Sequence, residues 1–163
     1  VNKKKYADVA AEMEDVLFEA ETLRRELTTA VEDDADAFEV LMGAYRLPKD
    51  DESRGDKIQQ ATLHAAMVPL SVAGKCVKVI ELAETVVSKG NVNAISDGAS
   101  GAAMAQAGLI SAGYNVRINL DGLDDRNKVQ ELISDMNVLE SEALDHQSQI
   151  MLHMQQRGGL SLA

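Results

Sequence analysis

Four long segments of the chain carry apolar residues at alternating spacings of three and four, and no stretch of useful length alternates apolar with polar residues. In the first segment, residues 5–47, the stripe includes Tyr6, Val9, Met13, Val16, Leu23, Leu27, Phe38, Leu41 and Tyr45. Spacings of three and four place side chains on one face of an α-helix. The pattern therefore predicts an all-α protein built from long amphipathic helices.

The other three segments follow after short polar breaks and span residues 57–88, 93–120 and 127–156. The residue before a proline is disfavoured in the α conformation, so Pro48 should end the first helix at Leu47. Gly90 can take the left-handed conformation that often closes a helix, and Pro69 should kink the second helix. Short connections make successive helices antiparallel, so the sequence predicts an antiparallel bundle in one domain, residues 1–163.

Composition excludes several classes of protein. Lys and Arg number 16 and Asp and Glu 27, so the formal net charge is −11. A chain this acidic lacks the positive surface with which proteins bind duplex nucleic acid or anionic lipid. The single cysteine, Cys76, permits no intrachain disulfide, which suits a reducing compartment. The chain shows neither a secretory leader nor an unbroken apolar run of about 18 residues, so we expect a cytoplasmic protein that does not span a membrane.

A carboxylate interrupts the apolar stripe of the first segment. Asp34 lies seven residues after Leu27 and four before Phe38, which places the three on one helix face. Burying an unpaired carboxylate costs several kcal/mol. Asp34 is therefore expected to be buried or half-buried, and either paired with a group on a neighbouring helix or part of a functional site. The residues alone leave both interpretations open.

The third segment is rich in glycine and alanine and has a polar residue near each end. Asp97 and Asn115 are 18 residues apart, so they share one helix face at a separation of about 27 Å. Between them on that face lie Gly101, Met104, Gly108 and Ser111. These residues could line a groove for an elongated ligand, or they could simply allow tight packing while Asp97 helps to cap the helix. Both interpretations stay open.

Basic residues are few in this acidic chain, so they are candidates for binding ligand carboxylates, although each could equally be a solvated surface charge. The candidates are Lys5, Arg46, Lys49 and Arg117. The three histidines, His64, His146 and His153, lack the carboxylate-x-x-His spacing of di-iron bundles. No metal site is therefore predicted.

Three stretches together resemble one family. They run from Asp33 to Lys49, from Gly90 to Asp97 and from Asn115 to Leu120, and the stretches Lys3–Tyr6 and Val68–Leu70 agree with them. The chain resembles the cyclodeaminase domain of formiminotransferase-cyclodeaminase and its free-standing relatives, some of which are named methenyltetrahydrofolate cyclohydrolases. The resemblance implies an all-helical obligate homodimer that needs no cofactor besides its folate substrate. It also implies a glycine-rich segment and a first helix, both of which we expect to be absent from this chain.

The resemblance implies closure of 5-formiminotetrahydrofolate to 5,10-methenyltetrahydrofolate with release of ammonia. A second possibility is the cyclohydrolase reaction, in which water opens the 5,10-methenyl ring to give 10-formyltetrahydrofolate. A third, from another class, is a non-catalytic folate-binding or scaffold bundle. The sequence does not separate the first two, because both need the same groups around the one-carbon unit.

Residue chemistry and motif position together suggest a role for each candidate. Asp34 would transfer protons as base and then acid, with Asp97 as the second choice. A carboxylate near the one-carbon unit would also stabilise the cationic product. Asn93 and Asn115 would bind the pterin edge. The glutamate tail of a substrate, mono- or polyglutamylated, would be held by Lys5, Arg46, Lys49 or Arg117.

Overall fold

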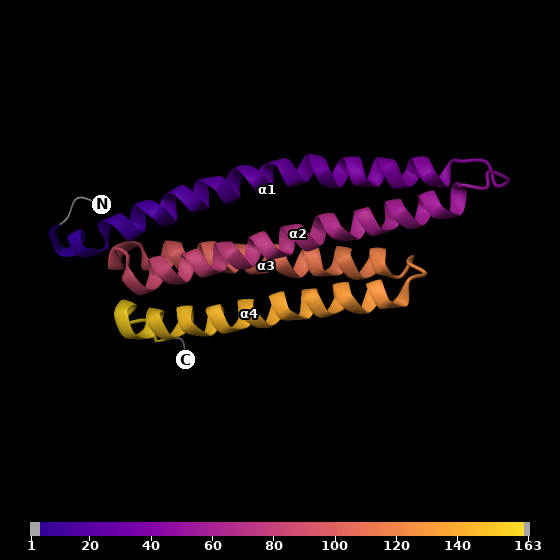
Figure 1. Cartoon of the computed structure of the whole chain (residues 1–163). Helices are drawn as coiled ribbons and strands as arrows, with labels where there is room; N and C mark the ends of the chain where they lie inside the picture. The colour runs from indigo at the N-terminus through magenta and orange to yellow at the C-terminus, as the bar shows by residue number, and fades with distance from the viewer. Residues whose placement is uncertain (1–3, 162–163) are drawn as a thin grey trace.

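The computed structural model describes residues 4–161, nearly all of them helical (Figure 1). The elements are η1 (Lys4–Val9), α1 (Ala10–Tyr45), α2 (Arg54–Lys89), η2 (Val92–Ala94), α3 (Ile95–Leu120) and α4 (Arg126–Gly158). No strand occurs among these residues, so the prediction of an all-α fold is confirmed. Lys3, which belongs to one stretch of the family resemblance, lies outside the described residues.

The central helix of the fold is α2. It packs against α1, α3 and α4, and α3 also packs against α4 (Figure 1). The main core consists of residues from α2, α3, α4 and the turn before α4, with Ile80, Leu109 and Met136 fully buried in it. Within residues 4–161, α1 contributes nothing to this core and packs almost entirely along α2. One face of α1 is therefore left without a neighbouring helix.

The α1–α2 hairpin extends beyond the α3–α4 turn, as Figure 1 shows. A small separate core holds this end together, and it consists of Leu41, Ala44, Ile58, Ala61 and Ala65. Arg54 at the start of α2 donates hydrogen bonds to the carbonyl oxygens of Leu47 and Tyr45, at 3.2 and 3.3 Å. These bonds satisfy carbonyls that the end of α1 leaves unpaired.

Pro69 lies inside α2, which continues through it as one helix. Because proline has no N–H, the carbonyl oxygen of Ala65, one turn earlier, loses its usual intrahelical partner. Asn119 of α3 donates its side-chain Nδ2–H to that oxygen at 2.9 Å. A neighbouring helix thus supplies the hydrogen bond that the proline removes.

This bond can be tested by replacing Asn119. We expect Asn119→Ala to lower the free energy of unfolding by about 1–3 kcal/mol, since it leaves a buried carbonyl without a donor. In a Pro69→Ala background, where residue 69 regains its N–H, the same change should cost less. Denaturant unfolding of the two single variants and the double variant measures this coupling, and purely additive effects would contradict it.

The end of α2 differs from the prediction made for Gly90. Gly90 is extended, with φ −69° and ψ −169°, so the expected left-handed cap is wrong at this position. Arg157 near the end of α4 instead donates to the carbonyl oxygens of Val87 and Gly90, the latter at 2.9 Å. A left-handed glycine does close α4, at Gly159 with φ 65°. A side chain of α4 therefore closes the end of α2, whereas the end of α4 is closed by its own backbone.

By length and composition alone, α2 would pass as a membrane-spanning helix, with a mean hydropathy of 1.4 over 18 residues. The central helix of a water-soluble bundle passes the same criterion. Here α2 is in contact with all three other long helices, and 39% of this 18-residue window is buried in the subunit.

Candidate functional site

A pocket of about 300 Å³ lies where α1, α2 and α3 meet, and we call it the Asp34 pocket. Three of its lining residues carry polar side chains: Asp34, Ser111 and Asn115. Its apolar walls include Leu27, Val31, Pro69 and Val72. Apolar walls with a few convergent polar groups are typical of small-molecule sites. The structure therefore brings Asp34 and Asn115, both chosen from the sequence, to one place.

Asp34 is exposed in the subunit, which corrects the expectation of a buried or half-buried carboxylate. Its helix face was predicted correctly, since Asp34 and Leu27 line the same pocket. That face is not covered, however, and the nearby Val31 and Phe38 are 70% and 57% exposed. Within residues 4–161, Asp34 takes part in no ion pair. Its carboxylate is therefore free to meet a ligand.

Asn115 and Ser111 form the polar wall on α3. The Nδ2–H of Asn115 donates to the backbone carbonyl of Ser111 at 3.0 Å. This bond holds the Asn115 side chain in place and leaves its amide oxygen as an acceptor at the pocket. The sequence predicts Ser111 on this face without assigning it a role, although its spacing of four from Asn115 indicates that the two are neighbours.

Gly108 brings α2 and α3 close together below the pocket. A Cβ atom at this position would lie 3.0 Å from Sγ of Cys76. Burial raises the pKa of the Cys76 thiol, so the group stays protonated and is a poor nucleophile. Cys76 therefore contributes packing at this site.

Asp97 lies in the first turn of α3, away from the Asp34 pocket. Its 18-residue separation from Asn115 corresponds to about 27 Å along the helix. Asp97 makes no side-chain cap bond, although its charge suits the positive end of the helix dipole. Within one subunit, Asp34 and Asp97 are too far apart to act on the same carbon atom.

Lys5 and Asn93 lie at the same end of the molecule as Asp97. The ammonium of Lys5 is 5.6 Å from the centre of the Tyr6 ring. The Tyr6 hydroxyl accepts a hydrogen bond from the backbone N–H of Val92 at 3.1 Å, which fastens η1 to the α2–α3 connection. Asn93 is exposed on η2, beside this contact.

An apolar groove connects this end with the Asp34 pocket. Two further cavities, of about 570 and 390 Å³, share Val16, Ala20 and Val86 as lining residues. The second of them shares Leu27 with the Asp34 pocket. Gly98 and Gly101 of the glycine-rich face of α3 line the second of these cavities, but Asp97, expected at one end of a groove along this face, lines neither.

The remaining basic candidates lie outside the groove. Arg46 and Lys49 are exposed in the turn between α1 and α2, and Arg46 is 3.9 Å from Glu39. Arg117 forms a two-pronged pair with Glu140 of α4, at 2.9 and 2.8 Å. A role for Arg117 at the glutamate tail would require this pair to open.

The sequence of the chain matches a known protein family over most of its length. The sequence model of formiminotransferase-cyclodeaminase matches residues 1–138. The chain belongs to this family. The methenyltetrahydrofolate cyclohydrolase of Methylorubrum extorquens is 46% identical over 147 residues, which are 88% of this chain and 71% of that protein.

Two other members show how the family varies in size. The formimidoyltransferase-cyclodeaminase of Rattus norvegicus is 30% identical over 118 residues, and the match covers 68% of this chain but only 22% of that protein. The crystal structure of formiminotetrahydrofolate cyclodeaminase from Thermotoga maritima superposes with a TM-score of 0.87 at 26% identity, covering 94% of this chain and 75% of that one. This family member thus shares the helical fold across nearly the whole chain.

Proposed function

We propose that the protein acts on the one-carbon unit between N5 and N10 of tetrahydrofolate, as a methenyltetrahydrofolate cyclohydrolase. The observation that carries this choice is the 46% identity with the cyclohydrolase of Methylorubrum extorquens. Identity with the rat and Thermotoga maritima cyclodeaminases is lower, at 30% and 26%. Cyclodeaminase activity, the first reaction that the sequence resemblance implies, is the second candidate because the fold is shared with a cyclodeaminase.

The Asp34 pocket supplies the groups that hydrolysis requires. Water attacks the carbon of the 5,10-methenyl cation while the Asp34 carboxylate accepts one of its protons. The bond from this carbon to N5 then breaks, the proton held by Asp34 passes to N5, and the proton of the new hydroxyl group leaves as the carbonyl of the N10-formyl group forms. One proton is released overall. The negative charge of Asp34 also stabilises the cation before attack.

Other groups of the pocket and its surroundings bind the substrate in this proposal. The amide oxygen of Asn115, held by the bond to Ser111, accepts from the pterin edge. The apolar walls at Leu27 and Val72 contact the ring faces. Arg46, Lys49 and Lys5 are exposed cations available to the carboxylates of the glutamate tail, and Asn93 offers a second amide to the pterin edge.

Assays with both substrates test the proposal. Purified protein is incubated with 5,10-methenyltetrahydrofolate, whose loss is followed by absorbance against the spontaneous rate, and with 5-formiminotetrahydrofolate, whose turnover releases ammonia. Ring opening above the spontaneous rate supports the cyclohydrolase. Ammonia release without ring opening would favour the cyclodeaminase. Binding of both compounds without turnover would contradict both proposed activities and would indicate a non-catalytic folate-binding bundle.

We also propose that the protein works as a homodimer. Large apolar side chains are 57–73% exposed on the two helices that flank the groove: Leu17, Val31, Phe38, Met104, Tyr114 and Ile118. Apolar surface of this extent marks an interaction site on a soluble protein. The same surface adjoins the Asp34 pocket, which a second subunit would help to close against water.

A pair of phenylalanines on α1 tests the dimer. Phe38 and Phe18 are both exposed, but they point about 160° apart around the helix. We expect wild-type protein to have about twice the chain mass of 17.6 kDa by light scattering, and Phe38→Glu to reduce it toward one chain. Phe18→Glu is the matched control and should leave the dimer intact. A wild-type mass of one chain at micromolar concentration would contradict this proposal.

A further inference from the structure

One face of α3 is exposed and carries no charge. It consists of nine exposed residues within an arc of about 120° around the helix, namely Ser96, Ser100, Ala103, Met104, Ala107, Ile110, Ser111, Tyr114 and Ile118. No charged residue occurs from 98 to 116, although the chain has a net charge of −11. A second copy of this acidic chain can therefore meet the surface without like-charge repulsion. We call this surface the α3 face.

Side-chain size changes along the α3 face. The centre line of its first half carries small residues, Ser96, Ser100 and Ala107. The second half carries Tyr114 and Ile118, which are 69% and 73% exposed. When two copies pack antiparallel about a two-fold axis, the small half of each copy meets the large half of the other. The large side chains then fill the space above the small ones, as close packing requires, so the face is complementary to itself.

The positions of these residues define one register. A two-fold axis at Ala107 places Ser96 opposite the partner's Ile118, because both lie 11 residues from the axis. The same axis places Ser100 opposite the partner's Tyr114. The members of each pair differ by about 40° around the helix, and Ala107 lies midway between them. Spacing along the helix and direction around it therefore indicate the same axis.

The α3 face alone is too small for a stable dimer. It is about 33 Å long and one helix wide, which corresponds to roughly 300 Å². Each partner of a standard interface buries about 800 Å². The adjoining face of α1 supplies further apolar surface, since Leu17, Val31 and Phe38 are 63%, 70% and 57% exposed. Val31 lines the Asp34 pocket together with Ser111 of the α3 face, so the two surfaces are continuous.

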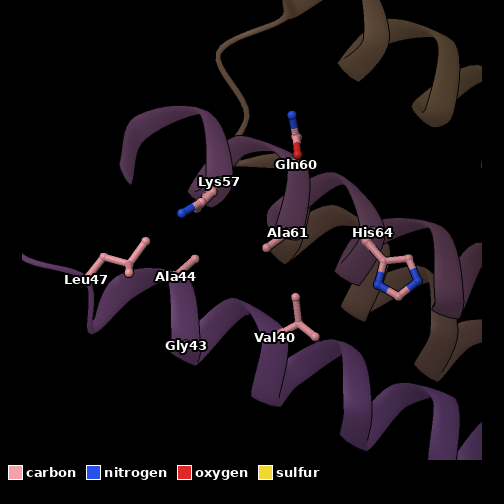
Figure 2. Close-up of a pocket in the computed structure, with 8 residues that line it drawn as sticks. All are labelled: Val40, Gly43, Ala44, Leu47, Lys57, Gln60, Ala61 and His64. Carbon is pink, nitrogen blue, oxygen red and sulfur yellow. The ribbon is translucent and has the colours of Figure 1, made fainter. Parts of the chain in front are cut away.

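The other flank of α1 is turned away from this contact. Val40 is as exposed as Phe38, but it lines a hollow of about 380 Å³ between α1 and α2 at the end of the hairpin (Figure 2). Val40 and Asp34 lie about 120° apart around α1. By light scattering, we therefore expect Val40→Glu to leave the mass of the dimer unchanged and Tyr114→Glu to reduce it toward one chain.

The register moves Asp97 to the Asp34 pocket of the other subunit. Asp97 and Asn115 lie on the same flank of α3, about 80° from the centre line of the α3 face, and a two-fold axis keeps equal flanks of the two helices together. With the axis at Ala107, the partner's Asp97 lies within about 3 Å of Asn115 along the helix axes. Asn115 lines the Asp34 pocket. The separation of about 27 Å within one subunit is thus removed between subunits.

We propose that Asp97 of the partner subunit completes the substrate site around Asp34, so that each site of the dimer is built from two chains. In this arrangement, which rests on the proposed folate function, the carboxylate and the amide oxygen of Asn115 accept hydrogen bonds from neighbouring N–H groups of the pterin edge. Hydrogen bonds to a carboxylate are stronger than those to a neutral acceptor. Asp34 remains the group that transfers protons.

Dimers that combine two variants test the two-chain site. Chains with Asp34→Asn and with Asp97→Asn carry different affinity tags, and purification on both tags isolates the heterodimer. One of its sites then contains both native aspartates, so turnover of 5,10-methenyltetrahydrofolate below KM should reach about half of the wild-type rate. Each variant alone should be at least about tenfold slower, and Asp97→Asn should raise KM more than it lowers kcat.

The matched control pairs a wild-type chain with a chain that carries both substitutions. It contains the same numbers of native and replaced aspartates, but neither of its two-chain sites has both native residues. Its turnover should therefore be no higher than that of Asp97→Asn. About half of the wild-type rate in this control, with low turnover in the first heterodimer, would place each site within one chain and overturn the proposal. Equal kinetics of wild type and Asp97→Asn would overturn it as well.

Disulfide cross-linking tests the register without substrate. In a Cys76→Ala background, Ala107→Cys should link to its own copy, since the axis brings the two Cα atoms within disulfide distance. Ser100→Cys and Tyr114→Cys should link to each other in a mixed sample but not to themselves, because equal positions lie about 21 Å apart. Ser141→Cys, exposed on α4, is the control and should not link.

The cross-linking results separate a wrong dimer from a wrong substrate. Self-linking of Ser100→Cys without linking of Ala107→Cys would overturn the register and the two-chain site. The expected links in a protein that does not turn over 5,10-methenyltetrahydrofolate would overturn the proposed function, and the role of Asp97 that rests on it, but not the register.

Discussion

Replacing Asp34 by asparagine is expected to slow turnover of 5,10-methenyltetrahydrofolate by about 10²- to 10⁴-fold, the usual contribution of a positioned acid–base group. Asparagine keeps the size and most of the polarity of the side chain but cannot take a proton from water. The stability of the fold should change little, because Asp34 is exposed and has no ion-pair partner within residues 4–161. Steady-state kinetics and thermal unfolding on the same preparation measure both quantities.

Asp33→Asn is the control for this experiment. Asp33 precedes Asp34 and is also exposed, but it lines a different cavity of about 400 Å³ together with His64 and Ser71. The two variants lose the same charge, so only proton transfer and contacts in the Asp34 pocket distinguish them. We expect near wild-type turnover for Asp33→Asn. Equal losses of turnover in both variants would mean that the negative charge of this surface, and not proton transfer by Asp34, accelerates the reaction.

A structural role for Asp34 would give a different pattern. If a partner subunit placed a cation against Asp34, the asparagine variant would leave that cation unpaired in the dimer interface. Breaking a buried pair typically costs about 3–5 kcal/mol. The melting temperature or the dimer affinity would then fall steeply, while the protein that remained folded and dimeric would keep its turnover number. A catalytic role thus predicts lower turnover with unchanged stability, whereas a structural role predicts lower stability with unchanged turnover.

The sequence predicted the existence of the helices well, because the apolar stripes are long and regular. It could not predict how much of each stripe is covered. In α1, Ala30 and Ala37 are buried against α2, whereas Val31 and Phe38, one residue further along, are exposed. Helical periodicity gives the direction of a side chain around its own helix, but the presence of a neighbour in that direction depends on the whole assembly. The burial expected for Asp34 was wrong for this reason.

The same limit applies to the candidate site. Helix phase correctly placed Leu27 and Asp34 on one face of α1, and Ser111 and Asn115 on one face of α3. That these two faces meet at one pocket is a tertiary property. The pairing of Arg117 with Glu140, 23 residues away on another helix, has no signal in a single sequence. Only the fold therefore shows which cations are held in ion pairs between helices and which can bind a ligand.

The sequence suggested a left-handed conformation at Gly90, but the structure gives a steric reason for glycine at this position. Gly90→Ala is expected to lower the free energy of unfolding by about 2–3 kcal/mol, and the melting temperature by roughly 5–10 °C. The added Cβ would lie 2.5 Å from the carbonyl oxygen of Val86, closer than such atoms approach in proteins. This oxygen belongs to the last turn of α2 and accepts the N–H of Gly90 at 2.8 Å, so it cannot rotate away. The φ of −69° is ordinary, so the need for glycine comes from this contact and not from backbone strain.

Gly74→Ala provides the matched control. Gly74 lies inside α2, the helix that ends just before Gly90, and an added Cβ would meet nothing within 4 Å, so the change should stabilise the protein by about 0.4–1 kcal/mol through helix propensity. Denaturant unfolding compares the two variants. A similar gain for both would show that the end of α2 can move to accept a side chain. Because Arg157 ties the carbonyls of Val87 and Gly90 to α4, such a movement should also stretch these bonds. A loss specific to Gly90→Ala that becomes smaller in an Arg157→Ala background would therefore show that the contact and the α4 connection act together.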